Sequence, residues 1–136
     1  MSALITPANK DFTMGNGLAI YKGSEWEIMI GILEQECLER TPFDLTGYTG
    51  KCSIKEKAGD DVPLAEPVVT IVDAENGAFS IYLSASQTAN IPTNGKTFKD
   101  VSKYQYDIYL TDSNDNSYRA LQGMVEVSPS VTEEDD

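Results

Sequence analysis

Apolar and polar residues alternate with a period of two over much of the chain, most clearly in its last third. From Tyr104 to Leu110 every second residue is apolar, and the same alternation runs from Leu121 to Val127. Such alternation places the apolar residues on one face of a β-strand. Residues 112–117, between the two segments, are Asp, Asn and Ser, which favour turns. The pattern predicts a β-hairpin whose apolar face needs a second layer to cover it.

Five further segments carry strand patterns. In residues 26–32, Trp26 and three isoleucines alternate with Glu, Met and Gly, which predicts a strand with one bulky apolar face. In residues 49–57, Lys51 and Lys55 are expected on the exposed face, where they would protect an edge strand from stray pairing. The remaining strands are expected at residues 18–22, 68–72 and 78–83.

Turn and cap residues separate these strands. Asn76-Gly77 is a hairpin signal, and Ser84 is suited to cap a single helical turn over residues 85–89. Residues 34–43 are interpreted as a polar connection. Seven short strands separated by turns predict an all-β fold, namely a seven-stranded antiparallel immunoglobulin-like β-sandwich with one short helical turn.

The predicted sandwich domain spans residues 18–128. Residues 1–17 contain Pro and Gly residues that break regular elements, and they are expected to form an extended N-terminal arm. Because a short arm of this kind seldom stays ordered on its own, we expect neighbouring chains to hold it, as in a large assembly. Residues 129–136 end in four acidic residues and are expected to form a solvated acidic C-terminal tail.

Composition and charge disfavour several classes of protein. The 136-residue chain has 22 acidic and 10 basic residues, and its net charge of −12 disfavours binding to nucleic acid or to anionic membranes. It contains no His, the usual general base near neutral pH and the commonest transition-metal ligand. It also has no apolar run of ~20 residues and no signal-peptide pattern, so we expect synthesis in a cytoplasm without general secretion. Cys37 and Cys52 are expected to be separate thiols, with a disulfide between them as the alternative.

Candidate ligand-binding residues are few. The aromatic residues that could stack on a sugar are Trp26, Tyr82, Tyr109 and Tyr118, together with the loop 112–117. Trp26 fits a core position better, because it continues a row of isoleucines. The side-chain oxygens of residues 112–116 would suit a calcium ion, but the loop lacks EF-hand spacing and its closing Glu, so a plain turn is favoured.

The remaining charged groups are interpreted as solvated surface. Three glutamates lie close together in residues 34–39, within a polar connection. Asp60 and Asp61 are adjacent, so on a strand they would point to opposite faces. No nucleophile lies in a pattern with a base. We therefore expect no enzyme, no catalytic residue, no cofactor and no metal site.

Several segments, in their order along the chain, resemble small tailed-bacteriophage virion proteins that have an immunoglobulin-like β-sandwich. They are residues 21–28, 44–49, 51–57, 76–84, 106–112 and 119–128. Residues 44–49 read Asp-Leu-Thr-Gly-Tyr-Thr, and residues 119–128 contain a Gly-x-Val-x-Val pattern. The layout is similar to the N-terminal domain of phage baseplate upper proteins, and it differs in a longer loop at residues 93–103 and in the N-terminal arm.

The resemblance implies a structural protein of a tailed-bacteriophage particle. It would act as a tail, neck or baseplate adaptor that bridges other virion proteins, including copies of itself. Its location would be the virion, assembled in the cytoplasm of a bacterial host, with no nucleic-acid or membrane partner. A capsid decoration or head-fibre base protein is an alternative, and a carbohydrate- or receptor-binding module is an alternative of another class.

Overall fold

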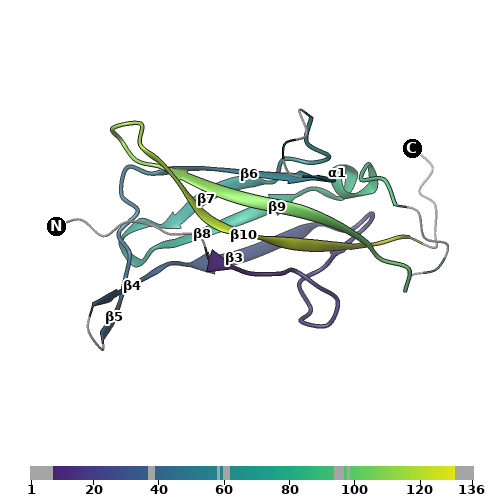
Figure 1. Cartoon of the computed structure of the whole chain (residues 1–136), viewed down its shortest axis with the longest axis horizontal. Helices are drawn as coiled ribbons and strands as arrows, with labels where there is room; N and C mark the ends of the chain where they lie inside the picture. Colours follow the sequence, from purple (N-terminus) through teal and green to yellow (C-terminus); the bar gives the residue numbers. More distant parts are fainter. Residues whose placement is uncertain are drawn as a thin grey trace.

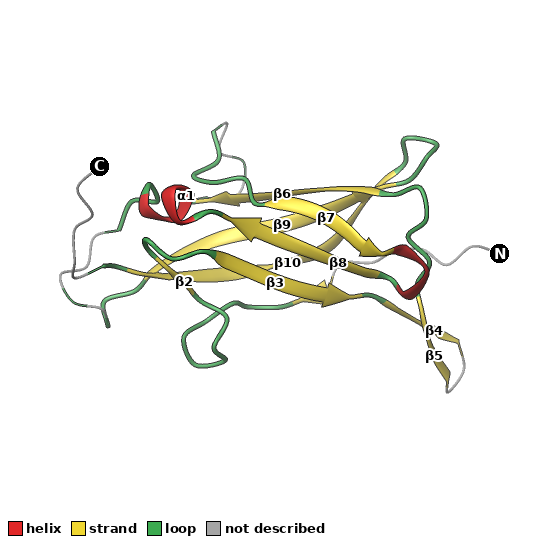
Figure 2. Cartoon of the chain, turned by 180° about the vertical axis from the view of Figure 1, so that it is seen from behind, coloured by secondary structure: helices red, strands yellow, loops and turns green. Residues whose placement is uncertain are grey.

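The chain folds into two β-sheets packed face to face, as the computed structural model shows (Figures 1 and 2). The structure describes residues 8–36, 39–57, 59, 62–93, 97 and 99–130, and for residues 34–36 and 39–42 it describes the backbone alone. Both sheets contribute apolar side chains to one shared core. A chain of this composition therefore has its hydrophobic layer between the sheets, as the alternating pattern predicts.

The larger sheet has the order β1-β10-β9-β6, with β2 also paired to β10. Its strands are β1 (Ala8–Asn9), β2 (Ile20–Tyr21), β6 (Thr49–Lys55), β9 (Ser102–Thr111) and β10 (Ser117–Ser128). The smaller sheet has the order β3-β8-β7, with β3 (Trp26–Gly31), β7 (Val68–Asp73) and β8 (Ala78–Leu83). Two short helical elements, η1 (Ala74–Asn76) and α1 (Ala85–Ala89), lie after β7 and β8.

The strand order is that of an immunoglobulin-like sandwich, which confirms the predicted fold class. The pairing is not antiparallel throughout, because β2 pairs in parallel with β10. Strands β3, β8 and β7 correspond to the B, E and D strands, and β6, β9 and β10 to the C, F and G strands. The hydroxyl of Tyr104, near the start of β9, donates to the carbonyl of Pro92 in the preceding connection. A tyrosine at this position that bonds back to the upstream backbone is a feature of such sandwiches.

The predicted alternation matches the observed burial. Phe79, Ile81 and Leu83 of β8 are fully buried, as are Ile108 and Leu110 of β9. The side chain of Trp26 is in the core, and its Nε1–H donates to the Leu18 carbonyl at 2.9 Å. All seven expected strands are present at the predicted places, and Lys51 and Lys55 lie on β6, an edge strand of the larger sheet.

The short helical turn also forms as predicted. Ser84 accepts a hydrogen bond from the Gln87 N–H, and the Gln87 side chain accepts one from the Ser84 N–H. This reciprocal pair satisfies two N–H groups that the first turn leaves without a helical partner. Gly77 adopts a φ of 69° after η1, which is the left-handed conformation expected at the Asn-Gly turn.

The prediction of a polar connection at residues 34–43 is wrong. The structure has an antiparallel hairpin there, β4 (Leu33–Glu36) with β5 (Glu39–Pro42). It projects from the end of the sandwich opposite α1 (Figure 2). Backbone hydrogen bonds join the two strands of this hairpin without a row of apolar side chains. The segment therefore shows no alternation of apolar and polar residues from which a strand could be recognised. The three glutamates and Cys37 lie outside the described side chains.

The N-terminal arm predicted at residues 1–17 is in large part a component of the sandwich. β1 pairs in parallel with β10, with Ala8 opposite Leu121. Further along, the Phe12 N–H donates to the Met124 carbonyl, and the Glu126 N–H donates to the Phe12 carbonyl, both at 2.9 Å. Residues of this segment are therefore paired with β10 of their own chain. Residues 1–7 lie outside the described residues.

Phe12 anchors this segment in the core. Its side chain is 1% exposed and stacks on Tyr106, with ring centroids 4.7 Å apart. It also meets the edge of Trp26 at a centroid distance of 5.6 Å. A two-residue strand that pairs with a segment more than 100 residues away leaves no local periodicity, which is why the sequence pattern did not indicate it.

We expect Cys52 to be unreactive in the folded protein. Its side chain is 1% exposed in β6, and burial, with a smaller effect of Asp107, raises the pKa of its thiol. The thiolate is the reactive form. In a Cys37→Ser chain, labelling by a disulfide reagent at pH 8 should be more than about 100-fold slower in buffer than in denaturant. Equal rates would show that the core around β6 opens freely.

Candidate functional site

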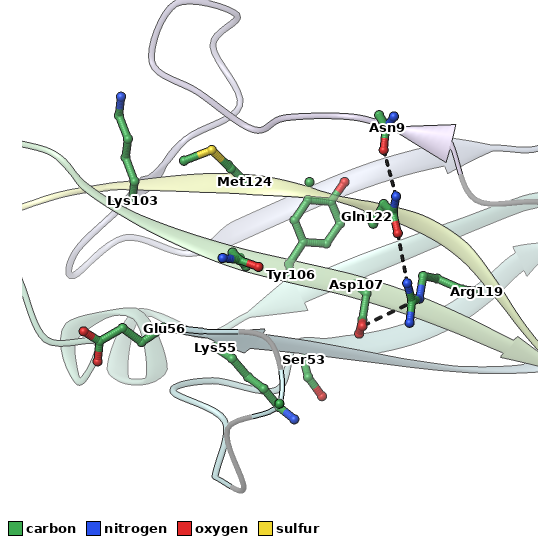
Figure 3. Close-up of a pocket in the computed structure, with 13 residues that line it drawn as sticks. Asn9, Ser53, Lys55, Glu56, Lys103, Tyr106, Asp107, Arg119, Gln122 and Met124 are labelled. Atoms are coloured by element: carbon green, nitrogen blue, oxygen red, sulfur yellow. Dashed lines mark hydrogen bonds and ion pairs between the residues drawn. The ribbon is translucent and has the colours of Figure 1, made fainter.

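The outward side of the larger sheet carries a broad, shallow hollow of about 550 Å³ (Figure 3). We call this outward side of the larger sheet the polar face. It is built by residues that alternate with the core positions of β6, β9 and β10, with β1 at its border. The lining of the hollow includes Asn9, Ser53, Lys55, Glu56, Gly59, Lys103, Gln105, Tyr106, Asp107, Arg119, Gln122, Gly123 and Met124. Amides, charged groups and backbone therefore dominate this surface.

Arg119 is the centre of a hydrogen-bonded row on the polar face. Its Nε and Nη2 donate to the Tyr109 hydroxyl at 3.0 and 2.8 Å, and its Nη1 donates to Gln122 Oε1 at 3.1 Å. Gln122 in turn donates to Asn9 Oδ1 at 3.0 Å, and Asp107 lies 4.0 Å from Arg119 Nε (Figure 3). The bond to Tyr109 is the main cause that raises the pKa of Arg119. The row fixes the side chains of three strands relative to each other.

The charge of the polar face differs from that of the whole chain. Its lining contains three basic side chains, from Lys55, Lys103 and Arg119, and two acidic ones, from Glu56 and Asp107. The chain as a whole carries a net charge of −12. The repulsion of acidic partners is therefore weaker at the hollow than the net charge of the whole chain implies.

The aromatic candidates for sugar stacking do not come together. Trp26 is in the core, and Tyr82 is on β8 of the smaller sheet. Tyr109 lies on the polar face, but the Arg119 guanidinium sits over its ring, 5.4 Å from the centroid. Tyr118 is opposite Leu110, one register position from Tyr109, so the two tyrosines point to opposite faces of the hairpin. No stacking platform is formed by these four residues.

The loop 112–117 is a turn held by its first residue. Asp112 Oδ1 accepts the N–H groups of Asn114 and Asn116, each at 2.9 Å. Asp115 has a φ of 64°, which Asp tolerates better than most residues. Within the described part of the chain, no three His, Cys, Asp or Glu side chains gather as metal ligands would. Asp60 and Asp61 lie outside the described residues.

The Asp112 turn should add a pH-dependent contribution to stability. Hydrogen bonds to the carboxylate, first from the Asn116 N–H, lower the pKa of Asp112 in the folded state. A lowered pKa stabilises the fold above the ordinary Asp range, and this contribution is lost as the pH falls through the folded-state value. Urea unfolding should therefore show Asp112→Asn to be less stable than the unmodified chain at pH 7, with a smaller difference near pH 3. A gap that stays constant with pH would contradict this origin.

The outward side of the smaller sheet carries exposed apolar side chains among polar ones, which include Glu27, Thr70 and Ser80. Met29 is 58% exposed, and Val68 and Val72 are each 55% exposed. Tyr82 is opposite both Glu27 of β3 and Val68 of β7, so its side chain shares this side. We call this surface the apolar face. Met29 of β3 is two strands away from Val68 and Val72 of β7, so the apolar face is a mixed surface and not one continuous apolar patch.

A groove of about 580 Å³ lies where β1 and β3 face each other along one side of the sandwich. Phe12, Leu18, Ile28, Ile30 and Leu121 give it an apolar lining. Lys10 and Glu27 are its charged residues, one of each sign.

The described part of the chain contains no helix long and apolar enough to cross a membrane.

Comparisons with known proteins show little likeness to this chain. No protein-family model matches it, and no curated protein matches it. Among solved structures, it is similar to murine CRIg, with 11% sequence identity over 94% of this chain and 97% of that chain, at a TM-score of 0.33. A likeness at that level carries no argument about function, so any proposal has to be based on the surfaces of the chain itself.

Proposed function

We propose that this protein is a non-catalytic structural component of a tailed-bacteriophage particle, an adaptor in the tail, neck or baseplate that contacts other virion proteins. The sequence resemblance supplies the phage assignment. The observation that carries the role in assembly is the apolar face, because Met29, Val68 and Val72 leave more than half of their side-chain surface uncovered. Contact with another protein would bury this surface and gain ~25 cal/mol for each Å² of apolar area.

The other features are consistent with a binding role. The row from Asn9 through Gln122 to Arg119 on the polar face is hydrogen-bonded within itself. A catalytic site instead needs a nucleophile or a proton-transfer group free to meet a substrate. The separation of the four candidate aromatics gives no support to the carbohydrate-binding alternative.

The direct test is to look for the chain in purified particles. Phage particles from the source strain would be purified on a density gradient and probed with an antibody raised against this protein. We expect the protein to sediment with intact particles, in tens of copies or fewer for a tail, neck or baseplate part. A far higher copy number would indicate the capsid-decoration alternative, and absence from particles would refute the proposal.

The apolar face can be tested by introducing charge. Val68→Lys combined with Val72→Lys should prevent incorporation into particles, because two desolvated ammonium groups oppose the contact. Both side chains are exposed, so the free energy of unfolding should change by less than about 1 kcal/mol. Gln105→Lys, which adds a positive charge to the exposed side of the other sheet, is the matched control. If both variants are incorporated normally, the apolar face is not the contact.

A further inference from the structure

The groove between β1 and β3 is bordered by two strand edges. Among the described strands, β3 pairs with β8 alone and β1 pairs with β10 alone, so each has a second edge. Both strands line the groove, which has a volume of about 580 Å³. This value is within the range of ~300–1,000 Å³ typical of ligand pockets. The side of the sandwich is therefore open at the place where an added strand would fit.

The second edge of β3 presents backbone N–H groups. The Ile32 N–H donates to the Gly77 carbonyl, on the side of β8, and the register between β3 and β8 is regular. N–H groups alternate sides along an antiparallel strand, so those of Glu27, Met29 and Gly31 point away from β8. An extended segment can pair with such an edge through main-chain hydrogen bonds.

The lining of the groove specifies what kind of segment fits. Its apolar side chains favour an apolar segment, and its two charged residues are of opposite sign. Residues 1–7, Met-Ser-Ala-Leu-Ile-Thr-Pro, match this description, because they include Leu4 and Ile5 and carry no charged side chain. In a chain of net charge −12, an uncharged segment can approach a second copy with the least repulsion.

The position of β1 indicates that residues 1–7 bind in the groove of a second copy and not in the groove of their own chain. Ala8 is already paired with Leu121, so a return into the same groove would require a reversal at Thr6-Pro7. Two-residue hairpin turns need a positive φ at their first position, which a β-branched Thr rarely adopts. Pro is restricted to a negative φ.

We propose that residues 1–7 of one copy pair with the free edge of β3 in a second copy and place Leu4 or Ile5 in its groove. The chain would then associate with itself by adding a strand to the smaller sheet. This contact joins copies of the same chain and does not depend on a place in a phage particle. Val68 and Val72 of the apolar face remain available to other partners, since they lie on β7 at the opposite edge of that sheet, whereas Met29 also lines the groove.

Sedimentation equilibrium of the purified full chain tests the proposal without any particle component. The mass should rise above that of one chain as the concentration increases. A chain lacking residues 2–6 should keep the mass of one chain, and it should remain folded because it retains the pairing of Ala8 and Asn9 with β10. A full chain that stays at the mass of one copy, or a truncated chain that associates equally well, would overturn the proposal.

Two substitutions identify the contacting groups. Met29→Pro removes an N–H that faces the free edge, so it should abolish association while the pairing with β8 stays intact; Met29→Ala is its control. Leu4→Asp with Ile5→Asp lies outside the described fold and should raise the dissociation constant at least about tenfold. Circular dichroism checks that the Met29→Pro variant is folded. If that variant does not fold, the double Asp variant at Leu4 and Ile5 tests the association instead. Unchanged association of the double Asp variant would refute the role of the segment.

Discussion

Replacing Phe12 by Ala is expected to lower the free energy of unfolding by about 3–5 kcal/mol. The side chain is 1% exposed, and it fills the space between Tyr106 of the larger sheet and Trp26 of the smaller one. Its removal leaves a cavity and also loses two aromatic contacts, each worth about 0.5–1.5 kcal/mol beyond buried area. Urea unfolding followed by Trp26 fluorescence measures the effect, because Trp26 is the chain's single Trp and touches Phe12.

A neighbouring aromatic residue provides the control. Tyr21 of β2 is 41% exposed, so Tyr21→Ala should lower the free energy of unfolding by less than about 1 kcal/mol. Equal effects of the two substitutions would mean that Phe12 is not anchored between the sheets. The residues from Ala8 to Phe12 would then be a loosely attached arm, as the sequence alone indicated, and β1 would contribute little to stability.

The fold could be predicted from the sequence to the extent that local patterns determine it. Alternation identified β3, β8 and β9, because each has one face in the core. Capping chemistry identified α1, since Ser84 and Gln87 stand at the required spacing. β1 and the β4–β5 hairpin were missed because their residues, Ala-Asn, Leu-Glu-Gln-Glu and Glu-Arg-Thr-Pro, show no alternation of apolar and polar side chains. Segments this short do not establish a period.

The surfaces could be predicted less well than the fold. Sequence alternation shows that Met29 and Tyr109 face outward, but it does not show what lies beside them. The stacking of Arg119 on Tyr109 and the bond from Gln122 to Asn9 depend on the register of three strands. The groove depends on the distance between the edges of two sheets, which no local pattern encodes. One signal was available: Phe12 is a large apolar residue in an otherwise polar and glycine-containing segment.

Gly123→Ala is expected to lower the free energy of unfolding by about 2–4 kcal/mol. A Cβ at this position of β10 would lie 2.2 Å from the Lys10 carbonyl oxygen and 2.9 Å from the Lys10 carbonyl carbon. These are backbone atoms, so the whole N-terminal segment has to move away. That movement breaks the bond from the Tyr106 hydroxyl to the Lys10 carbonyl and draws Phe12 out of the core.

The two substitutions should not be additive, and their coupling tests the shared cause. If Gly123→Ala acts by displacing the segment that Phe12 anchors, it should cost much less in a Phe12→Ala background, where that anchor is already lost. Gly31→Ala is the matched control, because its added Cβ meets no atom within 4 Å, and it should change stability by less than about 0.5 kcal/mol. Additive effects of Gly123→Ala and Phe12→Ala in urea unfolding would show that the close approach of β10 to Lys10 and the anchoring of Phe12 are independent. Strong coupling would instead identify residues 8–12 as one cooperative unit that forms one wall of the groove.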